Sequence, residues 1–202
     1  MSLYYRFAYG IGFRPWEQDS AKMTAQIGSL FAREETGREP PYGLALDLGC
    51  GTGPWAVLLA QRGWRVVGID LIPKAVRAAR HRAQTAGVDI RFLVGDVTAL
   101  REAGVGTGFR FLLDVECFNW LNDDQRTAMG QEVDAVASDD AALLVLVWAR
   151  ARRGPMPRGA NREDLATAFP RWHITDEEPY AAELPRPLRN IDPHWYRLTR
   201  NQ

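Results

Sequence analysis

Leu44-Ala45-Leu46-Asp47-Leu48-Gly49-Cys50-Gly51-Thr52-Gly53-Pro54 is the most informative stretch of the sequence. Its apolar first half predicts a buried strand, and Pro54 is typical of the first turn of a helix, where its missing N–H removes no hydrogen bond. The glycines between them lack the Cβ atoms that would block a sharp turn or the approach of a ligand to the backbone. A helix that begins at Pro54 directs its free N–H groups toward the same point. We therefore predict a strand, a ligand-binding turn and a helix, in this order.

Further strands and helices alternate along the chain. Strands are predicted over 65–70, 90–94, 111–114 and 142–148, and helices over 18–35, 54–60, 73–86, 123–137 and 162–169. Asp123 or Asp124 is expected to cap the helix that runs to Ala137. Apolar strands that alternate with helices indicate an α/β fold with a parallel sheet buried on both faces. No helix is expected between the last two strands, 172–175 and 194–198, so these two should pair antiparallel.

The composition indicates one domain without a membrane span. The chain has 202 residues, 46% of them hydrophobic, and its 25 basic residues balance 25 acidic ones, which argues against a dedicated nucleic-acid binder. No apolar run reaches the ~20 residues that span a bilayer, and the start does not resemble a signal peptide. The cysteines, Cys50 and Cys117, have neither disulfide-scaffold nor metal-ligand spacing. We expect a cytoplasmic, metal-free monomer or homodimer with no membrane or nucleic-acid partner.

The glycine turn alone fits two cofactors. Gly51, Gly53 and Ala56 satisfy the G-x-G-x-x-G/A dinucleotide pattern, and Asp70 follows Gly51 by nineteen residues, as the ribose-binding acid of an NAD site would. However, Asp47, Asp96 and Asp114 also stand at the ends of predicted strands. Four acids at one edge of a sheet would repel the phosphates of a dinucleotide and attract a cationic ligand, such as a sulfonium or an ammonium.

These segments resemble the class I S-adenosylmethionine-dependent methyltransferases. Leu46–Gly53 is similar to their first motif, and residues 67–70, 95–97 and 111–114 are similar to the second, third and fourth, so the resemblance covers about residues 42–150. Arg14-Pro15-Trp16-Glu17, Cys117-Phe118-Asn119-Trp120-Leu121 and Arg126 further resemble the thiopurine and tellurite-resistance type of small methyltransferases. Asn119 departs from that type, whose members often carry His at this position.

The resemblance implies a fold and an organisation for the chain. The fold would be a Rossmann-like three-layer sandwich with a mostly parallel seven-stranded sheet and a C-terminal antiparallel strand. One domain would span residues 1–202. It would comprise an N-terminal aromatic lid and helix (1–40), a cofactor-binding core (42–150), and C-terminal strands with substrate loops (151–202).

The resemblance also implies the cofactor-binding residues, with S-adenosylmethionine as the cofactor and S-adenosylhomocysteine as the product. The set is Trp16, Asp47, Gly49, Cys50, Gly51, Gly53, Asp70, Leu71, Asp96, Val97, Asp114 and Val115. The glycines and Asp47 would approach the methionine part, Asp70 the ribose hydroxyls, and Asp96 with the Val97 backbone the adenine. Asp114 and Val115 would lie beside the transferable methyl, and Trp16 would fold over the cofactor.

The expected activity is in-line methyl transfer to a small molecule that ionises easily, such as a thiol or a phenol. Asn119 and Asp114 are the only candidate catalytic residues, and the alternative for Asp114 is a local cap. Cys50 is expected to pack against the sheet rather than act as a nucleophile, because no base stands near it in the sequence. An NAD(P)-dependent oxidoreductase and a non-catalytic S-adenosylmethionine-binding domain remain as alternatives, whereas nucleic-acid methylation is disfavoured because the signature of amino-directed enzymes is missing.

Overall fold

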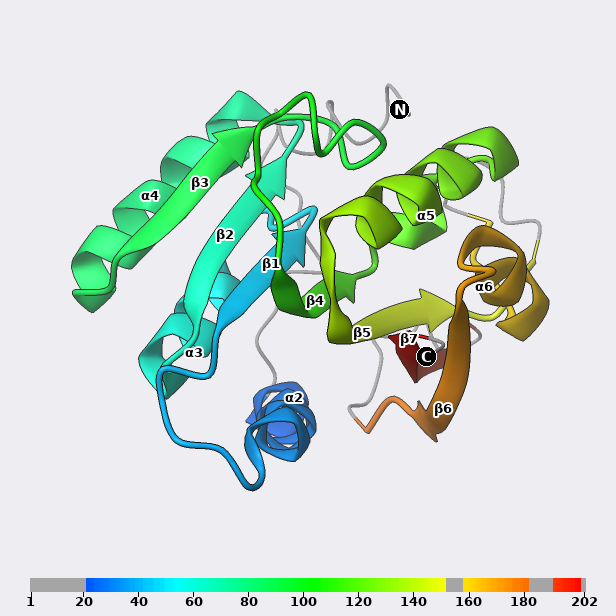
Figure 1. Cartoon of the computed structure of the whole chain (residues 1–202), viewed down its shortest axis with the longest axis horizontal. Coiled ribbons are helices and arrows are strands. Elements are labelled where there is room, and N and C mark those ends of the chain that lie inside the picture. The colour runs from blue at the N-terminus through cyan, green and yellow to red at the C-terminus, as the bar shows by residue number, and fades with distance from the viewer. Residues whose placement is uncertain (1–20, 152–157, 182–190, 201–202) are drawn as a thin grey trace.

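The computed structural model describes residues 21–151, 158–181 and 191–200. These residues form one seven-stranded sheet flanked by helices (Figure 1). The strands are β1 (Leu44–Leu48), β2 (Arg65–Asp70), β3 (Ile90–Val94), β4 (Phe109–Val115), β5 (Ala137–Trp148), β6 (Trp172–Pro179) and β7 (Pro193–Arg200). The helices are α2 (Ala21–Glu35), α3 (Pro54–Arg62), α4 (Pro73–Ala86), α5 (Asp123–Val136) and α6 (Arg162–Ala168), with the 3-10 helix η2 (Cys117–Trp120) between β4 and α5.

The sheet has the strand order β3-β2-β1-β4-β5-β7-β6. β1 to β5 pair in parallel, and β7 is antiparallel to both of its neighbours, β5 and β6. The chain crosses over after β3, so that β4 lies against β1 on its other side. This reversal leaves a crevice at the carboxyl ends of the central strands, where open α/β sheets bind their ligands. The predicted fold class, with its C-terminal antiparallel strand, is confirmed.

Apolar side chains cover both faces of the sheet and produce three layers. On one face, Leu46 and Leu48 of β1 pack in a cluster with residues of α5 and α6. On the other face, Ala45 packs in a second cluster with residues of α2, α3 and α4. Successive residues of a strand point to opposite faces, so a strand that is apolar throughout can supply both clusters. Figure 1 shows the two groups of helices on the two sides of the sheet.

The ends of several elements differ from the prediction. Asn122, rather than Asp123 or Asp124, caps α5: its side chain accepts the Gln125 backbone N–H, and the Gln125 side chain accepts the Asn122 N–H in return. This reciprocal capping box satisfies two backbone donors together. Ala137 belongs to β5 rather than to the helix, because β5 follows α5 without a loop. Within the described ranges, no helix is long and apolar enough to cross a membrane.

α5 and α6 approach each other closely at Gly130. A Cβ atom built on Gly130 would lie 1.7 Å from the Ala168 carbonyl oxygen, so only glycine fits at this crossing. Gly28 of α2 is also helical, but a Cβ there would meet nothing within 4 Å. Both glycines are helical, but only Gly130 is required by a close contact with a neighbouring helix.

We expect Gly130→Ala to destabilise the protein by about 2–3 kcal/mol, because the two helices must separate to admit the methyl group. Gly28→Ala is the matched control. It should stabilise the protein by about 0.5–1 kcal/mol, since alanine favours an open helical position over glycine. Urea unfolding measures both changes, and equal effects of the two substitutions would contradict the close crossing.

Candidate functional site

The predicted acids meet at the carboxyl edge of the sheet. In the sheet register, Leu48 of β1 lies beside Ile69 of β2 and Asp114 of β4. Asp47 therefore sits one residue inside the edge, and Asp70 ends the neighbouring strand. The negative charge of Asp47 raises the pKa of Asp114, and that of Asp70 raises the pKa of Asp47. The fold thus concentrates negative charge at one point.

The glycine turn above these acids adopts left-handed backbone conformations. Gly49, Gly51 and Gly53 have φ values of 70°, 53° and 78°, which L-residues with side chains rarely adopt. The Cys50 N–H donates to the Ile69 carbonyl at 2.9 Å and fastens the turn to β2. A Cβ on Gly49 would also lie 2.7 Å from the Cβ of Cys117, so η2 packs directly on the turn. The predicted strand, turn and helix are confirmed.

Asp47 is a buried carboxylate with a free oxygen. Its side chain is 1% exposed, and its Oδ2 accepts no hydrogen bond from any described residue. Burial, followed by the charge of Asp70, raises the pKa of Asp47 to about 7, against the lowering effect of the Ala56 backbone N–H. A buried carboxylate is tolerated only with a proton, a cation or hydrogen-bond donors at hand. The Asp47 site therefore fits a ligand that brings positive charge or N–H groups.

Asp70 holds the turn in place. Its Oδ2 accepts the Gly51 N–H at 3.0 Å, and its Oδ1 accepts the Ile72 N–H at 2.8 Å. The residue is 3% exposed, so these bonds form in a largely water-free setting. Each carboxylate oxygen has a second lone pair for a further donor. Asp70 thus shapes the backbone of the turn in addition to its expected role toward a ligand.

The next strand end carries Asp96 and Val97. The Asp96 Oδ1 accepts both the backbone N–H and the hydroxyl of Thr98, at 2.9 and 2.8 Å. Val97 packs its side chain into the cluster under α5, so only its backbone can face a ligand, as expected. Leu71 directly follows β2, and Val94 is the last residue of β3. Both are large hydrophobic residues that are exposed to solvent.

Asp114 forms a local cap. It is fully buried, and both of its oxygens lie within hydrogen-bond distance of the Phe118 N–H, at 3.2 and 3.1 Å. Burial raises its pKa to about 8, although the N–H groups of Phe118 and Cys117 lower it. Asp114 was expected to bind the cofactor and was a candidate catalytic residue, with a local cap as the alternative; the hydrogen bonds of its carboxylate form such a cap.

Asn119 joins η2 to the end of β5. Its Oδ1 accepts the Trp148 backbone N–H at 3.0 Å, and its Nδ2 donates to the Leu146 carbonyl at 3.4 Å. The residue is 1% exposed. Both polar atoms of the amide are engaged with backbone, so Asn119 positions the strand end rather than facing a substrate.

Arg126 fastens the segment that follows β5. It donates to the Gly159 carbonyl at 2.6 Å, lies 3.4 Å from an Asp164 carboxylate oxygen and stacks 4.6 Å above the Phe118 ring. Burial, followed by the charge of Arg158, lowers its pKa to about 10. Arg126 belongs to the segments that resemble the thiopurine and tellurite-resistance type of methyltransferase. In the structure it is buried and holds the segment around Gly159 against η2.

Glu116 is the residue that sequence reasoning did not single out. It has φ 73°, a left-handed conformation that is uncommon for a residue with a side chain. Its Oε1 accepts the Trp148 indole N–H at 3.0 Å, and burial raises its pKa to about 7. The sequence showed only that an acid follows the strand, because neither the backbone conformation nor the indole partner is local in sequence.

The two thiols of the site, Cys50 and Cys117, lie close to its carboxylates. Burial raises the pKa of both Cys50 and Cys117, and the neighbouring carboxylates raise them further. The expectation that Cys50 packs rather than attacks is confirmed. Trp16 and the Arg14–Glu17 stretch lie outside the described residues.

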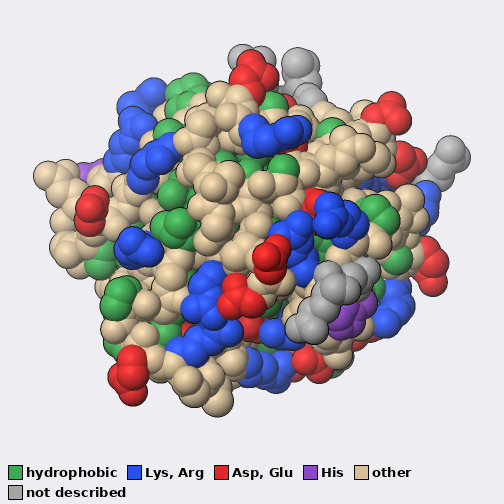
Figure 2. Space-filling model, viewed as in Figure 1, with side chains coloured by type: hydrophobic (Ala, Val, Ile, Leu, Met, Phe, Trp, Pro, Cys, Tyr) green, Lys and Arg blue, Asp and Glu red, His purple; other side chains and the backbone are tan. Residues whose placement is uncertain are grey.

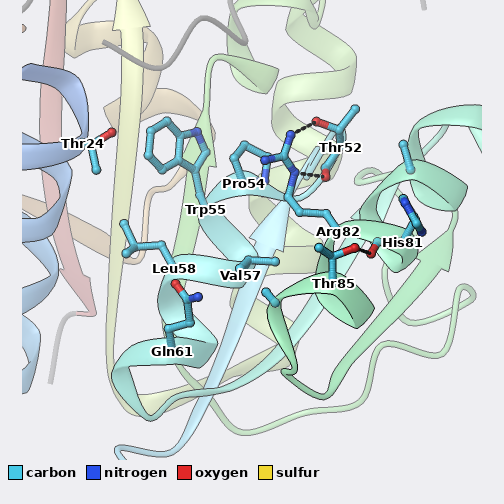
Figure 3. A pocket seen from close by; sticks show the side chains of 12 residues that line it. Thr24, Thr52, Pro54, Trp55, Val57, Leu58, Gln61, His81, Arg82 and Thr85 are labelled. Carbon is cyan, nitrogen blue, oxygen red and sulfur yellow. Dashed lines mark hydrogen bonds between the residues drawn. The ribbon is translucent and has the colours of Figure 1, made fainter. Parts of the chain in front are cut away.

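A groove of about 590 Å³ lies beside the turn rather than inside the acidic edge. It runs between α3 and α4, and Figure 3 shows Trp55, Leu58 and Gln61 along one wall. Arg82 extends from α4 and donates its Nε to the Thr52 carbonyl at 3.1 Å (Figure 3). This contact braces the glycine turn from outside.

Comparison with known proteins gives the family. Residues 45–140 match the sequence family described as "Methyltransferase domain". The 2-heptyl-1-hydroxyquinolin-4(1H)-one methyltransferase of Mycobacteroides abscessus is 30% identical over 143 residues, which are 68% of this chain and 62% of that protein. Residues 45–140 belong to the methyltransferase domain family.

Other relatives agree with this assignment. The methyltransferase domain is 38% identical over 124 residues to a demethylmenaquinone methyltransferase of Thermus thermophilus, over 57% of this chain and 49% of that protein. The chain thus spans less than two thirds of these curated relatives.

Solved structures share the class I methyltransferase fold. The 1,6-didemethyltoxoflavin-N1-methyltransferase of Burkholderia thailandensis superposes with a TM-score of 0.74 at 20% identity, over 98% of this chain and 86% of that one. TehB from Haemophilus influenzae gives a TM-score of 0.69 at 16% identity, over 87% and 62%. TehB represents the tellurite-resistance type that the sequence resembles.

The buried acids make the ligand-free protein less stable as the pH rises. The pKa values of Asp47 and Glu116 are raised to about 7 and that of Asp114 to about 8, whereas such groups ionise near pH 4 in an unfolded chain. Between about pH 4 and pH 8 the folded state therefore holds more protons, so the stability that these groups contribute is lost as the pH rises through 7 and 8.

We expect Asp114→Asn to flatten this dependence by on the order of 1 kcal/mol per pH unit near neutrality. Thermal or urea unfolding at several pH values between about 5.5 and 8.5 measures the slope. Asp89→Asn, at an exposed position, is the matched control and should leave the slope unchanged. The same slope in wild type and Asp114→Asn would contradict the raised pKa.

Proposed function

We propose that this protein transfers the methyl group of S-adenosylmethionine to a small-molecule acceptor. The observation that carries the proposal is the free Oδ2 of Asp47, buried beside a left-handed glycine turn at an acidic sheet edge. S-adenosylmethionine brings an ammonium and a sulfonium, which are the charges that this edge needs. A dinucleotide would bring phosphates to the same carboxylates, so the NAD(P) alternative is disfavoured.

The described residues fit the parts of this cofactor. The turn and Asp47 would hold the methionine part, Asp70 the ribose hydroxyls, and Asp96 with Leu71 the adenine. The Val97 backbone, Asp114, Val115 and Cys50 complete the proposed set, with Trp16 from the N-terminal segment. When bound, the cofactor supplies an activated methyl on a neutral leaving group, and the protein aligns the acceptor and excludes water.

A small and easily ionised acceptor, such as a thiol or a phenol, is part of the proposal. The relatives act, by their names, on a hydroxyquinolone, on demethylmenaquinone and on a toxoflavin precursor. The surface supports a small molecule over a nucleic acid, because basic and acidic side chains alternate over the face in Figure 2. Both cysteines are free thiols, which fits a reducing compartment such as the cytoplasm.

A thermal-shift panel with S-adenosylmethionine, S-adenosylhomocysteine, NAD and NADP tests the cofactor. We expect both adenosyl ligands to raise the melting temperature by several degrees at about 1 mM, because a ligand at 1,000 times its Kd stabilises the folded state by about 4 kcal/mol. A shift with NAD or NADP alone would overturn the proposal. Binding without methyl transfer to any small molecule would leave only a non-catalytic binding domain.

Asp47→Asn should weaken S-adenosylmethionine binding by about 30-fold or more, because it removes the charge and turns an amide N–H₂ toward the ligand. The same variant should be more stable than wild type at about pH 8 without ligand, since it removes a buried acid. Calorimetric titration and unfolding measure the two effects. Asp89→Asn is the control, and unchanged affinity in Asp47→Asn would show that the cofactor lies elsewhere.

A further inference from the structure

Glu116 lies in the short segment that joins the glycine turn to the end of β5. It follows the carboxyl end of β4, and its chain neighbour Cys117 packs on Gly49 of the glycine turn. On the other side, the Trp148 indole at the end of β5 donates to its Oε1. Glu116 is therefore held between the turn that we assign to the methionine part of the cofactor and the end of the next strand.

No arginine or lysine of the described ranges pairs with the carboxylate of Glu116. The other glutamates with largely covered side chains each hold an arginine: Glu35 pairs with Arg62, Glu132 with Arg101, and Glu34 with Arg197. Among the described residues, the neutral Trp148 indole is the hydrogen-bond partner of the Glu116 carboxylate, and Oε2 accepts no hydrogen bond from them. A covered carboxylate in this condition is ready to take a proton or a hydrogen-bond donor from a ligand.

The backbone fixes the direction of this carboxylate. Within the described ranges, Glu116 and Asp192 are the non-glycine residues with positive φ. Such a conformation is unfavourable for a residue with a side chain, and it persists where the surrounding structure imposes it. At Glu116, the Asp114 cap below and the indole beside it impose the conformation.

We propose that Glu116 is the general base of the reaction and that the acceptor is an aromatic hydroxyl compound. The inference rests on the proposed methyltransferase function. As the acceptor oxygen forms its bond to the methyl carbon, the carbon–sulfur bond breaks and its electron pair stays on sulfur. The hydroxyl proton passes to Oε2 of Glu116, and water later removes it. The products are the methyl ether, S-adenosylhomocysteine and one proton.

The chemistry of the site favours this acceptor class. A carboxylate whose pKa is raised to about 7 is a stronger base than an ordinary glutamate and is matched to a phenolic proton. An alkyl alcohol is too weak an acid to give its proton to such a carboxylate. Among the described groups, Asp114 of β4 interacts electrostatically with Glu116 and the neutral Trp148 indole of β5 donates to it, and neither brings a positive charge.

Kinetics with a panel of hydroxyaromatic acceptors tests the proposal. Phenols, catechols, hydroxyquinolines and hydroxyquinolones are supplied with S-adenosylmethionine, and S-adenosylhomocysteine formation is measured against pH. For the acceptors that turn over, we expect Glu116→Gln to lower kcat about 100-fold near pH 7.5 with little change in KM. Wild-type kcat should fall below about pH 7, and this limb should be absent from the variant. Nitrophenols that are already ionised should lose much less.

Two further variants separate catalysis from structure. Glu116→Gly suits the left-handed backbone, so it should keep the melting temperature and the S-adenosylhomocysteine affinity of wild type while kcat falls as in Glu116→Gln. Glu102→Gln, at an exposed position, is the matched control and should behave as wild type.

The outcomes are distinct. Wild-type kinetics in Glu116→Gln, or a surviving pH limb, would overturn the role of Glu116. Binding of S-adenosylhomocysteine without turnover of any hydroxyaromatic acceptor would overturn the acceptor class but keep the cofactor. No binding of either adenosyl ligand would overturn the proposed function itself.

Discussion

The main constraint on this structure is the burial of carboxylates at the carboxyl edge of its sheet. Asp47 and Asp114 are almost completely removed from water, and no arginine or lysine is paired with either of them in the described ranges. Burial without a cation is unfavourable, and their pKa values rise accordingly. The apolar clusters on both faces of the sheet supply the stability that lets the fold tolerate these groups. A cationic ligand at this edge would therefore stabilise the buried carboxylates.

Backbone hydrogen bonds give this edge its shape. Asp70 ties the glycine turn to the end of β2, and Asp114 caps η2 at the end of β4. Asn119 then connects η2 to the end of β5. Each polar side chain satisfies buried backbone groups that no regular strand or helix could reach. Carboxylates and amides therefore build the crevice, and Asp47 and Glu116 each keep an oxygen that accepts no hydrogen bond from a described residue.

Much of this could be predicted from sequence because its signals are local. Gly49, Gly51 and Gly53 indicated a sharp turn, which the structure confirms, and the apolar strands indicated a sheet covered on both faces. The cap of α5 was misplaced by one or two residues because three adjacent polar residues can all cap a helix, and only the reciprocal Gln125 bonds distinguish Asn122. The close approach of Gly130 to Ala168 had no local signal, since the two residues come from different helices.

The sequence by itself determined where the polar groups stand along the chain: a glycine turn, and an acid at or near the end of each of the first four strands. Periodicity and residue type act over a few neighbouring positions, so they are readable in one dimension. Only the tertiary structure decided which of those acids is satisfied and which is free. The carboxylate of Asp114 accepts the Phe118 N–H of the 3-10 helix η2. Asp47 and Glu116, by contrast, each have an oxygen that accepts no hydrogen bond from a described residue. That difference arises from partners such as Trp148, which lies 32 positions away in the sequence and is brought to Glu116 by the pairing of β4 with β5.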